Sequence, residues 1–199
     1  MENLETKAPV RELKVNGMLH LKVYTKQDVL SLTKLRRFET KLGERLQLLN
    51  NTADIAKSIA SSSAKYVLFG VPEDLGAKGN FGIGGADTLW IPFLQSLLNI
   101  QSNDFFDGAE VLLIGHFDFG DMQYLIDTTA KSEDEKIEAY RHAVNTVDDE
   151  VEHLAKIITE VKKIPIVVGG GHNNSYPLIK GAAKGWHQAG VLPLAQINC

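Results

Sequence analysis

The stretch Val167-Val168-Gly169-Gly170-Gly171-His172-Asn173-Asn174-Ser175-Tyr176-Pro177 decides the expected fold. It connects an apolar strand to a helix through three consecutive glycines, which let the backbone turn sharply and approach a ligand closely. The pattern predicts that His172 lies at the carboxyl edge of a sheet, next to the N-terminus of a helix. A neutral imidazole at that position can bind a metal ion or transfer a proton. Physics alone gives equal weight to a plain turn histidine that bonds to the backbone.

Apolar strands alternate with amphipathic helices along most of the chain. Expected strands cover residues 66–71, 110–115, 165–169 and 192–198. A long helix is predicted from Ser132, because apolar residues recur at steps of three and four through residue 161 and because Ser132 and Glu135 form a capping-box pattern. Further helices are expected over residues 86–99 and 175–189. This alternation is typical of α/β proteins, so we expect a three-layer αβα fold with a mainly parallel sheet, truncated at its C-terminal end.

The N-terminal third differs in character from the expected core. Residues 1–64 are predicted to form an arm and helices, and residues 65–199 the first part of the α/β core of a single domain. A helix is expected after Lys26, because apolar residues recur at helical spacing, namely Leu35, Phe38, Leu42, Leu46 and Leu49. A shorter helix is expected over residues 53–62, with Thr52 as its N-cap.

The composition argues against several classes of function. The 199-residue chain carries a net charge of -4 and no basic stripe, so nucleic acid is not an expected partner. Its apolar runs fall far short of the roughly 20 residues needed to cross a membrane. The N-terminus lacks the apolar segment of a signal peptide, and the single cysteine, Cys199, excludes an internal disulfide. A cytoplasmic protein is therefore expected.

A second glycine-rich segment follows the first core strand. It runs Gly70-Val71-Pro72-Glu73-Asp74 and continues through several glycines to Gly85. Glu73 and Asp74 are candidates for orienting a cationic substrate group, although solvated loop acids explain them at least as well. The segment lacks the Gly-Lys-Ser/Thr of a P-loop. A nucleotide-binding α/β protein that uses this loop and the following helix N-terminus remains an alternative.

Two other features have simpler explanations. Asp118-Phe119-Gly120 spells the metal-binding tripeptide of kinases, but the other kinase motifs are missing, so a turn after the second core strand is expected. Trp90 and Phe93 are expected to be core residues of their helix rather than a cage for a ligand.

The segment from Gly169 to Tyr176 resembles the Gly-Gly-x-His-(Asp/Asn/Ser) segment of the ureohydrolase family of arginase, agmatinase and formimidoylglutamase. The loop from Gly70 to Gly85 is similar to the family's first active-site-side loop. The resemblance implies a manganese-dependent hydrolase of a linear amidine or guanidine. It also implies that His172 is a ligand of a binuclear Mn²⁺ site and makes Asn174 a candidate substrate contact. The Glu73-Asp74 version of the loop, followed by Leu97-Leu98-Asn99-Ile100-Gln101, is closer to formimidoylglutamase-like bacterial members.

The chain departs from the family where most metal ligands are expected. Family members continue from the strand that matches residues 195–199 into Asp-x-His-x-Asp and later Asp-x-Asp, and neither motif follows here. The other histidines do not replace these ligands: His20, His116, His142, His153 and His187. The resemblance therefore implies that the catalytic residues lie beyond Cys199 and that this N-terminal portion is inactive alone. A non-catalytic fragment or binding module is the alternative. The expected partner is a small-molecule amidine or guanidine, and a homo-oligomer is left open.

Overall fold

The computed structural model describes residues 17–186, while residues 1–16 and 187–199 lie outside the description. One sheet of five strands runs through the described part: β1 (Leu21–Val23), β2 (Gln47–Leu48), β3 (Tyr66–Gly70), β4 (Val111–Phe117) and β5 (Ile164–Val168). The α-helices of the same part are α1 (Lys26–Leu32), α2 (Leu42–Arg45), α3 (Ile55–Ser61), α4 (Leu75–Gly79), α5 (Trp90–Leu98), α6 (Gly120–Thr129), α7 (Glu133–Glu160) and α8 (Ser175–Gly185). Short 3-10 turns complete it: η1 (Ala86–Thr88), η2 (Gly108–Glu110) and η3 (His172–Asn174).

The described sheet is mixed and mostly parallel. Its order is β1-β4-β3-β5, and β2 also pairs with β4. β3 pairs in parallel with both β4 and β5, and β2 is parallel to β4, whereas β1 is antiparallel to β4. The parallel pairing predicted for the strands near 66–71, 110–115 and 165–169 is therefore confirmed. The strand expected at 192–198 lies outside the described residues.

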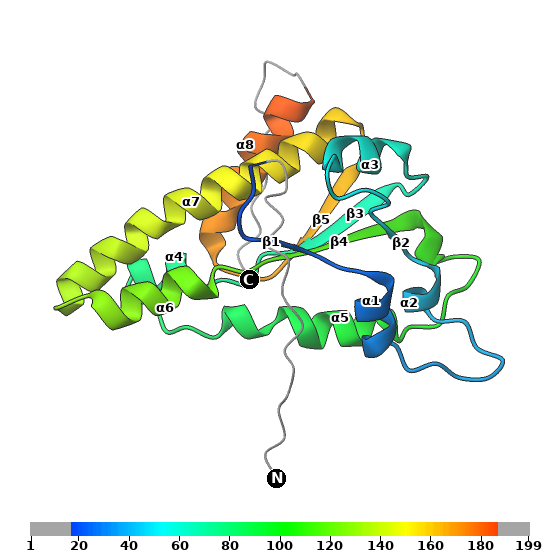
Figure 1. Cartoon of the computed structure of the whole chain (residues 1–199), viewed down its shortest axis with the longest axis horizontal. Helices are drawn as coiled ribbons and strands as arrows, with labels where there is room; N and C mark the ends of the chain where they lie inside the picture. Colours follow the sequence, from blue (N-terminus) through cyan, green and yellow to red (C-terminus); the bar gives the residue numbers. More distant parts are fainter. Residues whose placement is uncertain (1–16, 187–199) are drawn as a thin grey trace, which may run out of the picture.

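Helices cover both faces of the sheet, which confirms the predicted three-layer αβα arrangement (Figure 1). Along β3, Val67 and Phe69 belong to a core that includes residues of α3 and α7, while Leu68 belongs to a second core with α1 and α5. Successive side chains of a strand point to opposite faces, so β3 contributes to both cores. Its side chains are buried on both faces, as is typical of a central parallel strand.

Helix α7 confirms the long amphipathic helix predicted from Ser132. Its buried stripe includes Tyr140, Val147, Val151, Leu154 and Ile158. The Ser132 hydroxyl oxygen accepts a hydrogen bond from the Glu135 N–H at 3.2 Å, as a helix cap should. The Glu135 carboxylate accepts from the Lys131 N–H at 2.9 Å instead of from Ser132, so only half of the predicted capping box forms.

The prediction of a long helix after Lys26 is wrong. α1 ends within two turns, and Phe38, a residue of the expected apolar stripe, is 91 % exposed with φ at 67°. Residues 47–48 pair with β4 instead of continuing a helix. A bridge between Lys41 and Gln101 also ties this segment to a distant loop. These long-range backbone pairings override the local helical spacing.

Other element boundaries also differ from expectation. α3 is capped by Asp54, whose carboxylate accepts from the Lys57 N–H at 2.9 Å, and not by Thr52. The expected turn at Asp118 is present, and its carboxylate accepts from the Gly120 N–H at 3.1 Å. That turn leads directly into α6, which the sequence analysis missed. The glycine-rich loop contains the short helix α4, and the helix expected over 86–99 begins as the 3-10 turn η1 before it becomes α5.

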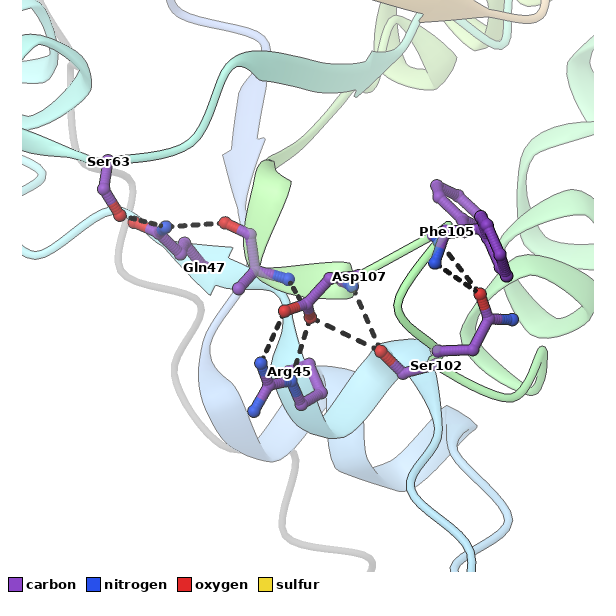
Figure 2. Close-up of polar contacts among 10 residues, drawn as sticks. Arg45, Gln47, Ser63, Ser102, Phe105 and Asp107 are labelled. Carbon is purple, nitrogen blue, oxygen red and sulfur yellow. Dashed lines mark hydrogen bonds and ion pairs between the residues drawn. The ribbon is translucent and has the colours of Figure 1, made fainter.

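An ion pair at the amino end of β4 fastens α2 to the sheet (Figure 2). The Arg45 guanidinium donates two hydrogen bonds to the Asp107 carboxylate, at 2.9 and 2.5 Å. The guanidinium and then the Ala109 N–H hold the pKa of Asp107 well below its usual range. The Gln47 side-chain amide extends this network by donating to the Ala109 carbonyl at 2.7 Å and to the Ser63 hydroxyl at 2.8 Å. The amino end of the sheet is thus held by side chains from three separate segments.

A search of residues 17–186 finds no helix with both the length and the apolar character needed to cross a bilayer. The last residues of the helix expected over 175–189 fall outside the described part. The single-domain organisation of residues 1–199 stays a prediction.

The pairing of β1 with β4 predicts a strong effect of one glycine substitution. Gly115 has φ at 149°, and a Cβ there would lie 1.9 Å from the Lys22 carbonyl oxygen. Gly115→Ala is therefore expected to lower the free energy of unfolding by about 2 kcal/mol or more in urea denaturation. Gly85→Ala is the matched control, because Gly85 has φ at 133° but an added Cβ would meet no atom within 4 Å. Equal losses in the two variants would contradict the close approach of β1 to β4.

Candidate functional site

The carboxyl ends of β3 and β5 lie side by side because the two strands pair in parallel. Gly70 is opposite Val168, and the Val71 N–H donates to the Val168 carbonyl oxygen at 2.9 Å. The loops that follow the two strands therefore start from adjacent points, at the edge where open α/β sheets bind ligands. His172 follows β5 at this edge, in the turn η3, which is the position the sequence predicts.

The Glu73 carboxylate joins these two loops. Its residue is only 2 % exposed, and one carboxylate oxygen accepts hydrogen bonds from the Gly171 N–H at 2.9 Å and from the Asn174 side-chain amide at 2.7 Å. The other oxygen accepts from the Gly76 N–H at 3.3 Å. Burying a carboxylate is costly unless donors replace its water. Amide N–H groups from both loops supply those donors, so the carboxylate holds the loops together.

Gly170 allows the His172 turn to press against the end of β3. Its φ is 78°, and a Cβ there would lie 2.2 Å from the Val71 carbonyl oxygen. Only glycine adopts this conformation and tolerates this contact without strain. The close approach that the three glycines predict is thus made, in this structure, to the loop after β3.

Asp74 shapes the glycine-rich loop from inside. It is 2 % exposed, and its two carboxylate oxygens accept from the Gly85 N–H at 2.7 Å and from the Ala86 N–H at 2.9 Å. These bonds close the loop that contains α4. The explanation of Glu73 and Asp74 as solvated loop acids is therefore wrong, because both side chains are buried and bonded to backbone. Their expected role toward a cationic substrate stays a prediction.

His172 and Asn174 differ in their surroundings although both belong to η3. His172 is exposed, whereas Asn174 is 4 % exposed and its amide nitrogen bonds to Glu73. Within residues 17–186, no three histidine, cysteine, aspartate or glutamate side chains come together closely enough to hold a metal ion. The donors of the described part therefore do not fit a binuclear manganese site. The roles predicted for His172 and Asn174 stay predictions.

Asp148 is a neighbouring acid that the sequence analysis missed. It lies on α7, and burial, followed by the charge of Asp149, raises its pKa to about 6, with Glu73 adding to the effect. One of its carboxylate oxygens is buried and makes no hydrogen bond with the described residues. Acids with raised pKa values gather at functional sites. The available signal was its position four residues after Val144, on the flank of the predicted apolar stripe.

Three of the other histidines, His20, His142 and His153, lie on or against α7. His142 and His153 are exposed on α7, as expected for a solvent-facing flank. His20 lies with its Nδ1 atom 2.9 Å from the Glu150 carboxylate. That carboxylate also accepts from the backbone N–H groups of Leu19 and His20, each at 3.1 Å. Glu150 therefore fastens the segment before β1 to α7.

The fold and the glycine-rich turn agree with a comparison to known protein families. A family model described as "Arginase family" matches residues 64–194. The chain therefore belongs to the arginase family, the ureohydrolase-type family that the His172 segment resembles. Neither a curated protein nor a solved structure matches the chain.

Because the Glu73 carboxylate accepts several buried hydrogen bonds, we expect its replacement by the uncharged glutamine to destabilise the protein. In Glu73→Gln the amide NH₂ group replaces one acceptor oxygen, which leaves a buried N–H without a partner. The free energy of unfolding is expected to fall by about 1–3 kcal/mol. Glu110→Gln is the matched control because Glu110 is exposed. If urea denaturation gives the same stability for both variants, Glu73 does not hold the two loops together.

The raised pKa of Asp148 predicts a pH-dependent gain of stability in Asp148→Asn. The folded protein binds this proton more tightly than the unfolded chain, in which an aspartate has a pKa of about 3.8, so the group favours folding at low pH. That contribution is lost as the pH rises from about 4 through about 6. The gain in stability of the variant over the wild type should be larger at pH 8 than at pH 4 by about 1–2 kcal/mol. This value is smaller than the full pKa shift would give, because the Asp148 side chain is only half-buried and solvent screens its charge. Thermal unfolding at both pH values measures this. A gain equal at both values, or equal to that of the exposed Asp104→Asn control, would contradict the burial of Asp148.

Proposed function

We propose that the chain carries part of the active site of a hydrolase that cleaves a C–N bond in a linear amidine or guanidine. The observation that most supports this is the Glu73-anchored turn of an arginase-family chain. This turn holds the exposed His172 at the carboxyl edge of a parallel sheet, where a ligand can reach the imidazole. The proposal assigns His172 the role of a metal ligand.

Manganese is the metal that the family resemblance suggests for this site. A manganese site takes about six oxygen and nitrogen ligands. The described residues contribute His172 to the proposal but no cluster of three donors. Glu73 and Asp74 use their carboxylate oxygens to bind backbone and side-chain N–H groups of the two loops. A manganese pair would therefore need carboxylate ligands from outside residues 17–186, and the described part alone does not form the centre.

Among the substrates of the family, we propose an amidine of the formimidoylglutamate type. Support comes from the Glu73-Asp74 version of the loop and from Leu97-Leu98-Asn99-Ile100-Gln101, which resemble formimidoylglutamase-like members. Guanidine substrates of the agmatinase or arginase type are the alternatives. The proposed partner is thus a small molecule, in a cytoplasmic protein that needs neither nucleic acid nor membrane.

The geometry of the glycine-rich loop argues against the nucleotide-binding alternative. A phosphate group at this loop would need free backbone N–H groups at the start of the following helix. The N–H groups of Gly85 and Ala86 already donate to the Asp74 carboxylate. A phosphate would have to displace this buried anion or be repelled by it. A non-catalytic binding module stays open because the described residues contain no metal cluster.

The 199-residue chain itself is expected to bind Mn²⁺ weakly and to hydrolyse no amidine, because residues 17–186 offer His172 and no cluster of three donors that could hold a metal pair. Isothermal titration with manganese chloride measures the first expectation. Hydrolysis assays with formimidoylglutamate and agmatine measure the second. Tight stoichiometric binding together with turnover would show that the proposed placement of the metal ligands is wrong.

A longer chain that continues from Cys199 through the family's Asp-x-His-x-Asp segment is expected to bind Mn²⁺ and to hydrolyse an amidine or guanidine. In that chain His172→Ala should weaken Mn²⁺ affinity at least about tenfold, because loss of a group that merely orients a metal ligand already costs about that much. His142→Ala is the control, because His142 is exposed on α7. If the longer chain hydrolyses neither formimidoylglutamate nor a guanidine such as agmatine, the proposed function is wrong. Unchanged manganese affinity in His172→Ala would contradict the ligand assignment.

A further inference from the structure

A cavity of about 240 Å³ lies at the carboxyl ends of β3 and β4, on the β4 side of Glu73. Glu73 lines it while its carboxylate bonds to the His172 turn, so the cavity and the turn lie on two sides of this residue. The residues that give the cavity its chemistry are Asp87, Trp90, His116, Phe117, Asp118 and Phe119. Neither the proposed hydrolase site nor the family match assigns a role to this cavity.

The cavity combines an aromatic floor with an acidic rim. Trp90, Phe117 and Phe119 are at most 2 % exposed, and the rings of Phe117 and Phe119 stack with their centroids 5.8 Å apart. Asp87 and Asp118 are the exposed acidic residues of its lining. None of the lining residues is a lysine or arginine. Such a lining disfavours an anion and suits a ligand with an apolar part and a positive charge.

His116 adds an uncharged wall. It is half-buried, and burial lowers the pKa of its imidazole, so it does not repel a cation at neutral pH. Its Nδ1 atom is buried and makes no hydrogen bond with the described residues. At the rim, burial and then a hydrogen bond with the Asp74 carboxyl raise the pKa of Asp87, while the charge of Lys78 opposes the rise. Asp118 has one cationic neighbour, with Lys22 Nζ 3.7 Å from its carboxylate.

We propose that this cavity binds a small organic ammonium ion, with its charged group at the acidic rim and a short apolar chain against the aromatic floor. A metal ion is a poorer occupant, because no three donor side chains of the described residues gather as a metal requires. A neutral apolar molecule would make no use of the negative charge of the rim carboxylates. The site goes beyond the proposed hydrolysis, and its occupancy requires no manganese and no turnover.

The direct test is a nuclear magnetic resonance titration of the metal-free 199-residue chain with butylammonium chloride. The Trp90 indole N–H, which donates to the Tyr24 hydroxyl at 2.9 Å, reports on the cavity. Trp186 is 46 % exposed at the end of α8 and serves as the internal reference. A Trp186→Phe variant assigns the two indole signals. 1-Butanol has the same chain without the charge and serves as the control ligand.

The expected result is a saturable shift of the Trp90 signal with butylammonium, no comparable shift of Trp186, and at least about fivefold weaker binding of 1-butanol. The double variant Asp87→Asn/Asp118→Asn should weaken butylammonium binding about fivefold to tenfold, since two partly screened charge contacts are lost. Asp104→Asn/Asp134→Asn removes the same charge from exposed residues that do not line the cavity, and should bind as the wild type does.

Three outcomes would overturn the proposal: no shift of the Trp90 signal, equal binding of 1-butanol, or equal binding by the two double variants. Because the titration contains no metal and measures no hydrolysis, its result is separate from that of the proposed enzyme activity. A failure of the hydrolase proposal would leave a positive titration intact, and the reverse also holds.

Discussion

The geometry of the candidate site depends on one buried carboxylate, that of Glu73. It accepts hydrogen bonds from Gly76 in its own loop and from Gly171 and Asn174 in the turn after β5. A carboxylate removed from water binds N–H donors strongly, because charge-assisted hydrogen bonds gain strength where water is excluded. The Glu73 carboxylate therefore fixes the loop after β3 and the turn after β5 relative to each other. The position of the exposed His172 follows from that of this turn.

The rest of the fold supplies the rigid frame for this contact. β3 lies between β4 and β5, is buried on both faces and pairs with both neighbours, so the ends of the three strands are fixed relative to one another. Helix α8 leaves the His172 turn and packs closely on α7, where a Cβ on Gly181 would lie 2.4 Å from the Glu152 carbonyl oxygen. The turn is thus held at both of its ends, by the sheet and by the α7–α8 contact. Such a frame suits a ligand site that needs a fixed direction of approach.

The sequence predicted those features of the fold that are set by neighbouring residues in the chain. The parallel strands and α7 followed from apolar periodicity, and the placement of His172 followed from a strand that runs into glycines and a helix. Features that depend on distant partners were missed. Glu73 and Gly171 are 98 residues apart, so nothing near Glu73 in the sequence reveals its acceptor role. Phe38 fits a helical stripe, yet long-range pairing leaves it exposed. Asp148 acquires its raised pKa only through burial and neighbouring charges in the folded chain.

The central claim is that the Glu73 carboxylate holds the His172 turn in the folded protein. Amide hydrogen exchange at Gly171 tests it most directly, because that N–H donates to Glu73 and to no strand partner. The account predicts protection of the Gly171 N–H comparable to that of the central strand β3, well above that of the exposed Asp104 N–H. Exchange of the Gly171 N–H as fast as that of Asp104 would contradict it.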